Sequence, residues 1–243
     1  MKLIPPPAHV AQGGALLLDF DGTLVPIAAR PDAVWVDPAL RDLLRALVAR
    51  LSGALAIVSG RSLASLDGLL APLVLPAAGE HGVALRPNPQ RPPVRANVPR
   101  LRPEWRKAVK ALAARHPGAL VEEKPAGLVL HYREAPAAGS ALWAGMRTLF
   151  GATQGFALAD ASMAIELRPR GIGKDDAVRT LMAEAPFAGR MPIFVGDDVT
   201  DESARAAARR LGGIGLDVAP TFGGSAARVR GWLTAAAARE GWA

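Results

Sequence analysis

The chain has 243 residues, of which half are hydrophobic and 21% are charged, and it contains no cysteine. This balance excludes a disordered chain, and the lack of cysteine excludes a disulfide scaffold, a thiolate zinc site and a thiol nucleophile. No apolar run approaches the roughly 18 residues of a membrane span. The opening residues 1–7, MKLIPPP, carry one lysine with no apolar stretch behind it, so we expect no signal peptide there. We therefore expect a cytoplasmic globular protein with no membrane partner.

The net charge of +7 is concentrated in residues 86–115, which hold nine basic side chains against the single acid Glu104. A basic segment of this kind is typical of nucleic-acid binding when aromatic residues are interleaved with it. Here Trp105 is the one aromatic residue in the segment, and no recognised binding motif is present. Nucleic-acid binding is therefore a distant alternative, and we expect no nucleic-acid partner.

Short apolar runs alternate with helical periodicity in the first part of the chain. This pattern predicts strands over 15–18, 54–58 and 73–75, and helices over 38–51 and 63–70. Strands and helices in alternation indicate a parallel sheet covered on both faces.

The pattern changes over residues 84–163. Six prolines within 86–103 predict a loop or an edge hairpin. The segment that follows is expected to hold helices over 104–114 and 138–150 and strands over 118–124, 127–133, 156–159 and 163–167. These elements form an α+β insert.

After the insert the first pattern resumes. We expect helices over 175–184, 201–211 and 225–239, the last polar enough to fray, and strands over 191–195 and 214–218. The chain is therefore predicted to be an α/β protein with a discontinuous core, residues 1–83 and 164–243, and an inserted α+β domain, residues 84–163.

Two carboxylates follow the first predicted strand, in the sequence LDFDGTL of residues 18–24. Asp19 and Asp21 are two residues apart, so on an extended chain both point to the same face. They lie at the end of the strand where open parallel sheets bind ligands, and two like charges there need a cation or a shared proton. For a lone Asp-x-Asp-Gly, a turn with one carboxylate capping a helix would be the preferred interpretation.

Three further segments place polar groups at the ends of predicted elements. Ser59 follows the second strand, and four acids follow a later strand in GDDVTDE (196–202), more than a helix cap requires. Lys174 lies near a helix start, where a cation is unfavourable unless an anion shares the position, although a solvated surface lysine is equally consistent. Together the four segments suit phosphoryl transfer, because they supply oxygen ligands for magnesium, a carboxylate nucleophile and donors for phosphate oxygens.

The motifs DFDGTL, SGR, Lys174 and GDDVTDE resemble the four motifs of the haloacid dehalogenase-like phosphatases. More narrowly, the chain resembles the trehalose-6-phosphate phosphatases in GEHG (79–82), in EEK (122–124) with GLVLHYR (127–133), and in ELRP (166–169). The resemblance covers residues 13–232. It implies a Rossmann-like core with a mobile α+β cap inserted after the Ser-Gly-Arg region, in agreement with the discontinuous layout.

The resemblance also implies roles for residues of the core. Asp19 would attack phosphorus and become an aspartyl-phosphate, while Asp21 would protonate the leaving sugar oxygen and later deprotonate the hydrolytic water. Ser59 and Lys174 would hold phosphate oxygens. Magnesium would be bound by Asp19, by the backbone carbonyl of Asp21 and by Asp197, with Asp201 as a candidate just behind them.

For the substrate, the resemblance implies that Glu123, Lys124 and Glu166 of the cap contact sugar hydroxyls. The remaining residues expected to bind the substrate are Phe20, Arg61 and His81. His131 also lies in a motif of the family, but its alternating strand allows a purely structural role.

The core motifs leave the sugar open. Phosphatases of the same superfamily that act on sucrose phosphate or a mannosyl phosphate are alternatives, and residues of the cap alone would separate them. A catalytically inactive scaffold conflicts with the presence of every core motif residue. We expect a small sugar phosphate as the partner, and a monomer is favoured.

Overall fold

The structure, a computed structural model, describes residues 6–7 and 13–238. Most of residues 1–7, where we expected no signal peptide, lies outside the described residues. The same holds for Arg239, the predicted end of the last helix. The chain forms two compact units, one of residues up to 95 together with those from 173 onward, and one of residues 96–172.

The first unit is built on a seven-stranded sheet with the order β11-β10-β1-β2-β3-β4-β5. Neighbouring strands are parallel from β11 to β3, and the last two strands add an antiparallel edge. The strands are β1 (Gly14–Leu18), β2 (Leu55–Val58), β3 (Ala77–Gly79), β4 (Ala84–Arg86), β5 (Val94–Arg95), β10 (Met191–Gly196) and β11 (Ile214–Asp217). Every residue of β1 and β2 is buried, as expected for central strands of a sheet covered on both faces.

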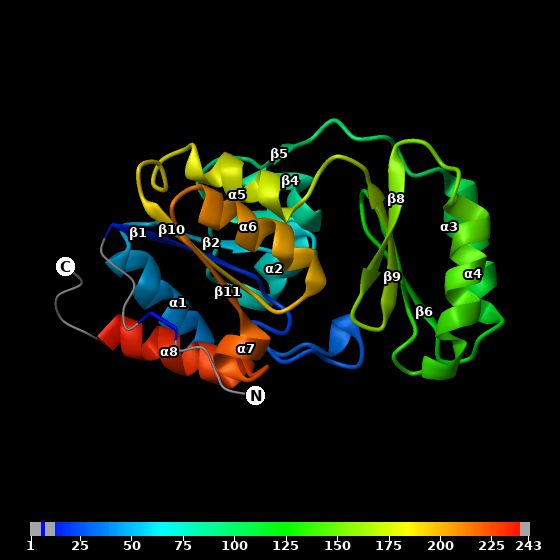
Figure 1. The fold of residues 1–243 in the computed structure, drawn as a ribbon, viewed down its shortest axis with the longest axis horizontal. Coiled ribbons are helices and arrows are strands. Elements are labelled where there is room, and N and C mark those ends of the chain that lie inside the picture. The colour runs from blue at the N-terminus through cyan, green and yellow to red at the C-terminus, as the bar shows by residue number, and fades with distance from the viewer. Residues whose placement is uncertain (1–5, 8–12, 239–243) are drawn as a thin grey trace. The chain divides into compact units, whose positions relative to one another are not determined.

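Helices cover both faces of this sheet. In Figure 1, α5 and α6 lie on one face and α1 and α8 on the other. The helices of this unit are α1 (Pro38–Arg50), α2 (Leu63–Leu70), α5 (Lys174–Met182), α6 (Glu202–Arg210), α7 (Val218–Phe222) and α8 (Ala226–Ala238). Helix α1 shows why they form: Asp37 accepts a hydrogen bond from the backbone of Ala39, Pro38 fills the first turn, and a leucine stripe at helical spacing is buried.

The second unit is a four-stranded antiparallel sheet with the order β6-β7-β9-β8 and two helices on one face. Its elements are α3 (Pro103–Ala114), β6 (Leu120–Glu123), β7 (Leu128–His131), α4 (Gly139–Phe150), β8 (Phe156–Ala161) and β9 (Ala164–Pro169). Leu128, Leu130, Ile165 and Leu167 point to the helices and form the core of this unit with residues of α3 and α4. Alternate residues of the same strands therefore point to the opposite face.

Short 3₁₀ turns complete the two units. They are η1 (Pro31–Ala33), η2 (Glu80–Gly82), η3 (Pro136–Ala138) and η4 (Val199–Asp201).

The third strand lies at Ala77–Gly79 and not at residues 73–75, so that prediction was wrong. Leu73 to Leu75 stand between Pro72 and Pro76, and the ladder to β2 begins only where Ala77 pairs with Ile57. Proline has no N–H to donate, so Pro76 contributes only its carbonyl, which accepts from the backbone N–H of Ile57, and the ladder does not extend back into the apolar run.

The limits of the two units also differ from the expected domain boundaries at 83/84 and 163/164. Residues 84–95 form a hairpin that pairs with β3 and so belong to the first unit, in the position of the predicted edge hairpin. Residues 164–169 pair with β7 and β8 and so belong to the second unit. Strand pairing, which a hydropathy pattern does not reveal, moves both boundaries toward the C-terminus.

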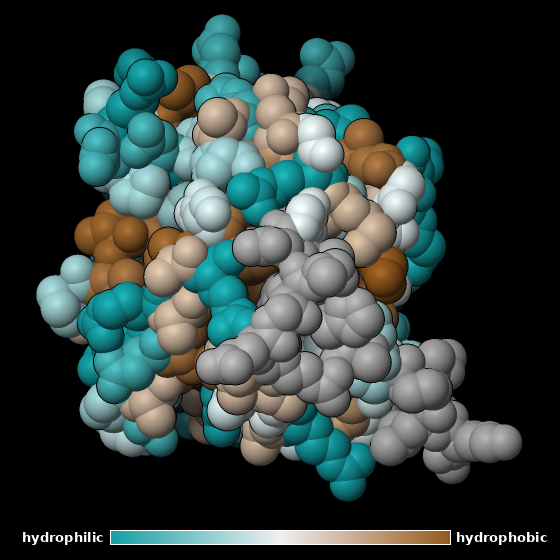
Figure 2. Space-filling model, turned by 90° about the vertical axis from the view of Figure 1, so that its left-hand side faces the viewer, coloured by the Kyte–Doolittle hydropathy of each residue, from teal (hydrophilic) through white to brown (hydrophobic). Residues whose placement is uncertain are grey.

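Two observations describe how hydrophobic residues are distributed over the surface and along the helices. On the face shown in Figure 2, hydrophobic residues form separate groups among hydrophilic ones. None of the helices in the described part of the chain is both long and apolar enough to cross a membrane.

Candidate active site

Three carboxylates meet at the carboxyl ends of two neighbouring strands of the first unit. Asp19 follows β1 and Asp197 follows β10, and these parallel strands pair with Leu18 opposite Val195. Asp201 ends the 3₁₀ turn η4 that comes after β10. One carboxylate oxygen from each residue lies within 4.8 Å of the other two. The acid cluster, as we call Asp19, Asp197 and Asp201, is thus a direct product of the parallel register.

Lys174 joins two members of the acid cluster. It is the first residue of α5 and is 3% exposed, and its Nζ donates to Asp19 Oδ1 at 2.6 Å and to Asp201 Oδ1 at 2.5 Å. Asp201 is fully buried, and its second oxygen accepts a hydrogen bond from the backbone N–H of Asp198 at 3.1 Å. Two of the three carboxylates therefore bind one buried ammonium, and the acid cluster keeps an excess of negative charge.

The electrostatics of the acid cluster show that excess. Burial, with the charge of Asp201 added, raises the pKa of Asp19 well above its ordinary value, although Lys174 opposes the shift. Burial and Asp201 also raise the pKa of Asp197 to about 6. Burial alone would lower the pKa of Lys174, but the charges of Asp19 and Asp201 outweigh it and raise that pKa. Carboxylate oxygens are the ligands that hard divalent cations prefer, so the acid cluster fits such an ion.

The turn after β1 brings Asp197 against the backbone. Gly22 has φ +80°, and a Cβ placed on it would lie 2.0 Å from Asp197 Oδ2. The hydroxyl of Thr23 donates to the other oxygen of Asp197 at 3.3 Å. Residue 22 must therefore be glycine both for its backbone conformation and for the space that the carboxylate occupies.

A buried arginine of α6 supports the acid cluster from behind. Arg205 Nη1 donates to the carbonyl of Gly196 at 2.9 Å, and Gly196 is the residue before Asp197. The same guanidinium forms ion pairs with Glu202 and with Asp217 at the end of β11. Arg205 thus ties the ends of β10 and β11 to one helix.

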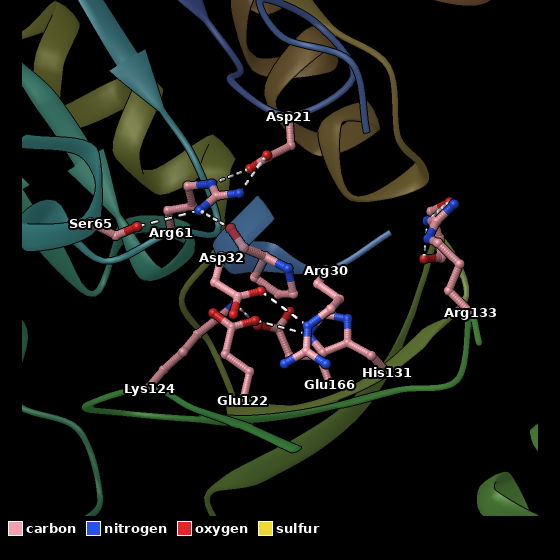
Figure 3. A network of polar contacts seen from close by, with 12 residues as sticks. Asp21, Arg30, Asp32, Arg61, Ser65, Glu122, Lys124, His131, Arg133 and Glu166 are labelled. Carbon is pink, nitrogen blue, oxygen red and sulfur yellow. Dashed lines mark hydrogen bonds and ion pairs between the residues drawn. The ribbon is translucent and has the colours of Figure 1, made fainter. Parts of the chain in front are cut away.

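The carboxylate of Asp21 is bound to Arg61. Arg61 Nε and Nη2 donate to the two oxygens of Asp21 at 2.6 Å and 2.8 Å, and Nη1 donates to the carbonyl of Pro31 at 3.2 Å (Figure 3). The guanidinium also lies 5.8 Å from the centre of the Phe20 ring. A bidentate pair of this kind fixes the direction of the carboxylate.

Ser59 stands at the end of β2, next to β1 in the sheet, and is 1% exposed. Its hydroxyl accepts a hydrogen bond from the backbone N–H of Arg61 at 3.1 Å, which leaves the hydroxyl proton available to another acceptor. Ser59 therefore offers a donor at the same edge of the sheet as Asp19.

The second unit carries a polar group on the face of its sheet that α3 and α4 leave open. Lys124 Nζ donates to Glu166 Oε1 at 2.8 Å, and the two side chains are 11% and 4% exposed (Figure 3). Glu122 and Glu166 share this face, because both lie opposite Val129 in the strand register. His131 lies 2.8 Å from Glu122 on the same face.

Comparisons with known proteins show the family to which the chain belongs. A sequence model of the family described as trehalose-phosphatase matches residues 17–230. The chain belongs to the trehalose-phosphatase family.

Relatives of known name support this membership. The chain is 36% identical to trehalose-6-phosphate phosphatase of Escherichia coli strain K12 over 204 residues, which cover 84% of this chain and 77% of that protein. It is 40% identical to a probable trehalose-phosphate phosphatase of Sinorhizobium fredii over 214 residues, which cover 85% and 78%. As a member of the trehalose-phosphatase family, the protein is an enzyme of the phosphatase type.

The fold agrees with that membership. The C-terminal domain of trehalose-6-phosphate phosphatase from C. albicans superposes with a TM-score of 0.79 at 22% identity, over 93% of this chain and 92% of that one. The predicted α/β fold and the predicted resemblance to the trehalose-6-phosphate phosphatases are therefore confirmed.

The structure corrects one member of the predicted site in this family enzyme. Glu123 is on the helix side of the second unit, where its carboxylate binds Arg106 at 2.5 Å and Lys110 at 2.6 Å, both from α3. Lys110 and then Arg106 lower the pKa of Glu123. The acid beside Lys124 and Glu166 is Glu122, because side chains alternate between faces along β6.

Two other residues predicted to bind the substrate, Phe20 and His81, lie in the first unit. Phe20 is fully buried, so its side chain packs in the core of the first unit and only its backbone is available to a ligand. The imidazole of His81 lies against Gly60 of the Ser-Gly-Arg loop.

Sequence reasoning missed Arg205 and Glu122. A signal for Arg205 was present, since it falls among the buried alanines of α6 and an arginine on such a face needs partners. For Glu122, the sequence shows two adjacent acids and does not say which face of the strand the helices cover.

Proposed function

We propose that this protein hydrolyses trehalose 6-phosphate to trehalose and phosphate, with Mg²⁺ bound at the acid cluster and through an aspartyl-phosphate on Asp19. The observation that carries the proposal is the junction of Asp19, Asp197 and Asp201 with Lys174 at the carboxyl ends of β1 and β10. Relatives at 36–40% identity whose names include this activity support the choice of sugar.

The residues that would hold Mg²⁺ are Asp19, Asp197 and the backbone carbonyl of Asp21, with Asp201 as the third carboxylate of the acid cluster. When bound, the ion supplies positive charge that offsets the repulsion between these carboxylates and a dianionic phosphate. Lys174 and Ser59 donate hydrogen bonds to the phosphate oxygens and so hold the group that is transferred.

In the first step, an oxygen of Asp19 forms a bond to phosphorus while the bond from phosphorus to the sugar oxygen breaks. Asp21 gives its proton to that sugar oxygen, and trehalose leaves. In the second step, Asp21 takes a proton from water as the water oxygen forms a bond to phosphorus and the bond from phosphorus to the Asp19 oxygen breaks. Phosphate leaves, and both aspartates return to their starting states.

The pair between Asp21 and Arg61 has a consequence for this sequence of steps. In the structure both oxygens of Asp21 accept hydrogen bonds from the guanidinium of Arg61. Asp21 must therefore leave at least one of these hydrogen bonds before it can act as the acid.

Sugar recognition is assigned to the open face of the second unit. Lys124 and Glu166 present a donor and acceptors that are largely buried, and sugar hydroxyls pair with such groups. Glu122 takes the place of Glu123 in this assignment, since Glu123 is bound to α3. A phosphate ester without the disaccharide forms none of these hydrogen bonds to sugar hydroxyls, which gives the site its selectivity.

The test is an assay of free phosphate from the purified protein across a panel of sugar phosphates, with Mg²⁺ and with excess chelator. We expect trehalose 6-phosphate to give the highest kcat/KM and chelator to abolish turnover. Higher kcat/KM for sucrose phosphate or a mannosyl phosphate would overturn the choice of sugar, and full activity in chelator would overturn the metal. A cytoplasmic location and a monomeric state stay predictions.

A further inference from the structure

The turn between β3 and β4 has a backbone conformation that side chains disfavour. Glu80 and His81 have φ values of 52° and 57°, both in the left-handed region, and they are 5% and 8% exposed. Two consecutive residues of this kind, neither of them glycine, persist only where their surroundings hold them.

Part of what holds the turn is the Ser-Gly-Arg loop after β2. The backbone N–H of Glu80 donates to the carbonyl of Arg61 at 2.8 Å, and that of His81 donates to the carbonyl of Ser59 at 3.0 Å. A Cβ placed on Gly60 would lie 2.6 Å from His81 Nε2, so the imidazole rests directly on the loop. The turn and the loop therefore fix each other.

An ion pair with the edge strand β5 also supports the turn. Arg95 Nη1 and Nη2 donate to the two carboxylate oxygens of Glu80 at 2.8 Å and 3.1 Å. This hydrogen bonding raises the pKa of Arg95 above its ordinary value. Arg95 belongs to β5, which pairs with β4 so that Ala84 lies opposite Arg95, and this pairing brings the guanidinium to the turn. Glu80 is held from its side chain and from its backbone at once.

We propose that Glu80 and Arg95 are positioning residues for the phosphate-binding loop. Their ion pair fixes the left-handed turn, and the backbone N–H groups of the turn then hold the carbonyls of Ser59 and Arg61. Through these contacts the pair sets the hydroxyl of Ser59 and the guanidinium that binds Asp21. The inference rests on the proposed function, because Ser59 has a phosphate to hold only if the protein is a phosphatase.

The proposal separates phosphate binding from metal binding. Ser59 and Arg61 contact the turn directly, whereas the hydrogen bonds found for the carboxylates of Asp19 and Asp201 come from Lys174 and from the backbone of Asp198. Loss of the ion pair should therefore weaken the affinity for phosphate while it leaves the affinity for Mg²⁺ unchanged. A general loosening of the fold would weaken both.

The variant is Arg95→Gln, which removes the charge from a side chain that is 45% exposed and so should leave the protein folded. We expect the dissociation constant for inorganic phosphate, measured by calorimetry in Mg²⁺, to rise about tenfold, with a similar fall in kcat/KM. The Mg²⁺-induced rise in Tm should equal that of the wild type. Arg95→Lys keeps one donor and the charge, so its phosphate affinity should lie between the two.

Arg86→Gln is the matched control. Arg86 lies on β4 and forms an equally bidentate pair with Asp67 of α2, at 2.8 Å and 2.6 Å, without a hydrogen bond to the turn among those found for the described residues. Its loss should lower Tm and leave the phosphate affinity unchanged. If Arg95→Gln is unstable, Glu80→Gln tests the same pair with a smaller change of charge.

A folded Arg95→Gln protein with wild-type phosphate affinity would overturn the inference, as would an equal loss of phosphate affinity in Arg86→Gln. A wild-type protein that binds inorganic phosphate but releases none from any sugar phosphate would overturn the proposed function instead, and the binding comparison between the variants would still decide the inference. A wild type that binds no phosphate would overturn both.

Discussion

At the scale of single residues, the contacts of the acid cluster predict that the positions around it tolerate little change. Asp19 and Asp201 accept hydrogen bonds from one buried ammonium, and Asp197 lies over a glycine backbone. Each of these contacts joins segments that are far apart in the sequence. A residue that looks like an ordinary turn or cap in isolation is therefore part of one electrostatic unit.

The two aspartates of the first motif should fail in different ways. Asp19→Asn should abolish turnover in a folded protein, because the nucleophile and a metal ligand are lost together. Asp21→Asn keeps the backbone carbonyl but removes the proton carrier, so turnover of trehalose 6-phosphate should fall roughly a hundred- to ten-thousand-fold. Pre-steady-state formation of the phosphoenzyme from an aryl phosphate should slow much less, because its leaving group needs little protonation. Equal slowing with both substrates would show that Asp21 is not the acid.

Gly22→Ala should damage the metal site although it replaces none of the residues that would bind the metal. The new Cβ would meet Asp197 at 2.0 Å and the backbone would be strained, so the carboxylate must shift. We expect the Mg²⁺ concentration for half-maximal activity to rise about ten- to a hundredfold, the range seen when the support of a metal ligand is lost. Gly68→Ala, in α2 with no atom within 4 Å of the added carbon, is the control and should behave as wild type. An unchanged Mg²⁺ requirement in Gly22→Ala would remove Asp197 from the site.

At the scale of elements, the strands that carry chemistry were readable because they are continuous apolar runs that end in polar residues. β1, β2 and β10 lie where those runs predicted them, and the meeting of the acids and the serine at their ends follows from parallel packing. β3 was not readable, because Ala77, Ala78 and Gly79 have little strand propensity and form a strand only through their partners. The ion pair of Glu80 with Arg95 depends on that same edge of the sheet and was equally hidden.

The adjacent acids of β6, Glu122 and Glu123, point to opposite faces of the sheet, so their substitution should have different effects. Glu122→Ala and Lys124→Ala should each lower kcat/KM for trehalose 6-phosphate about tenfold or more, since a buried polar partner is lost. Activity on a small aryl phosphate should change little, because that substrate has no sugar to contact these side chains. Glu123→Ala is the control: it removes ion pairs to α3, so it should affect Tm more than the ratio of the two kcat/KM values. A ratio that changes in Glu123→Ala and not in Glu122→Ala would reverse the assignment.

At the scale of the whole molecule, two units were predictable from the change in pattern, and their boundaries were not. Pairing of residues 84–95 with β3 and of 164–169 with β7 and β8 assigns these segments to units that their composition does not indicate. Part of the positive charge of residues 86–115 is also neutralised by ion pairs within the protein. Arg86 pairs with Asp67, and Arg95 pairs with Glu80.

The charge of the acid cluster should couple metal binding to the stability of the whole fold. Burial raises the pKa of Asp197 to about 6, so between its ordinary value and 6 the folded protein holds more protons than the unfolded chain. For this group, stability in the absence of metal is present at low pH and is lost as the pH rises through about 6. Mg²⁺ replaces the proton, so its stabilising effect on Tm should be larger at pH 7.5 than at pH 5. Asp197→Asn should reduce that difference, and an equal Mg²⁺ effect at both pH values would contradict the account.

The central claim is that Asp19, at the acid cluster, takes the phosphoryl group from the substrate. The most direct measurement combines Asp21→Asn with an aryl phosphate in Mg²⁺, because the first step then needs no acid and the second step has lost its base. After an acid quench, mass spectrometry of the digested protein should find a phosphoryl group on the peptide that contains Asp19, in an amount that matches the first burst of released phenol. A burst of phenol with no phosphoryl group on that peptide, or with one on another residue, would contradict the account.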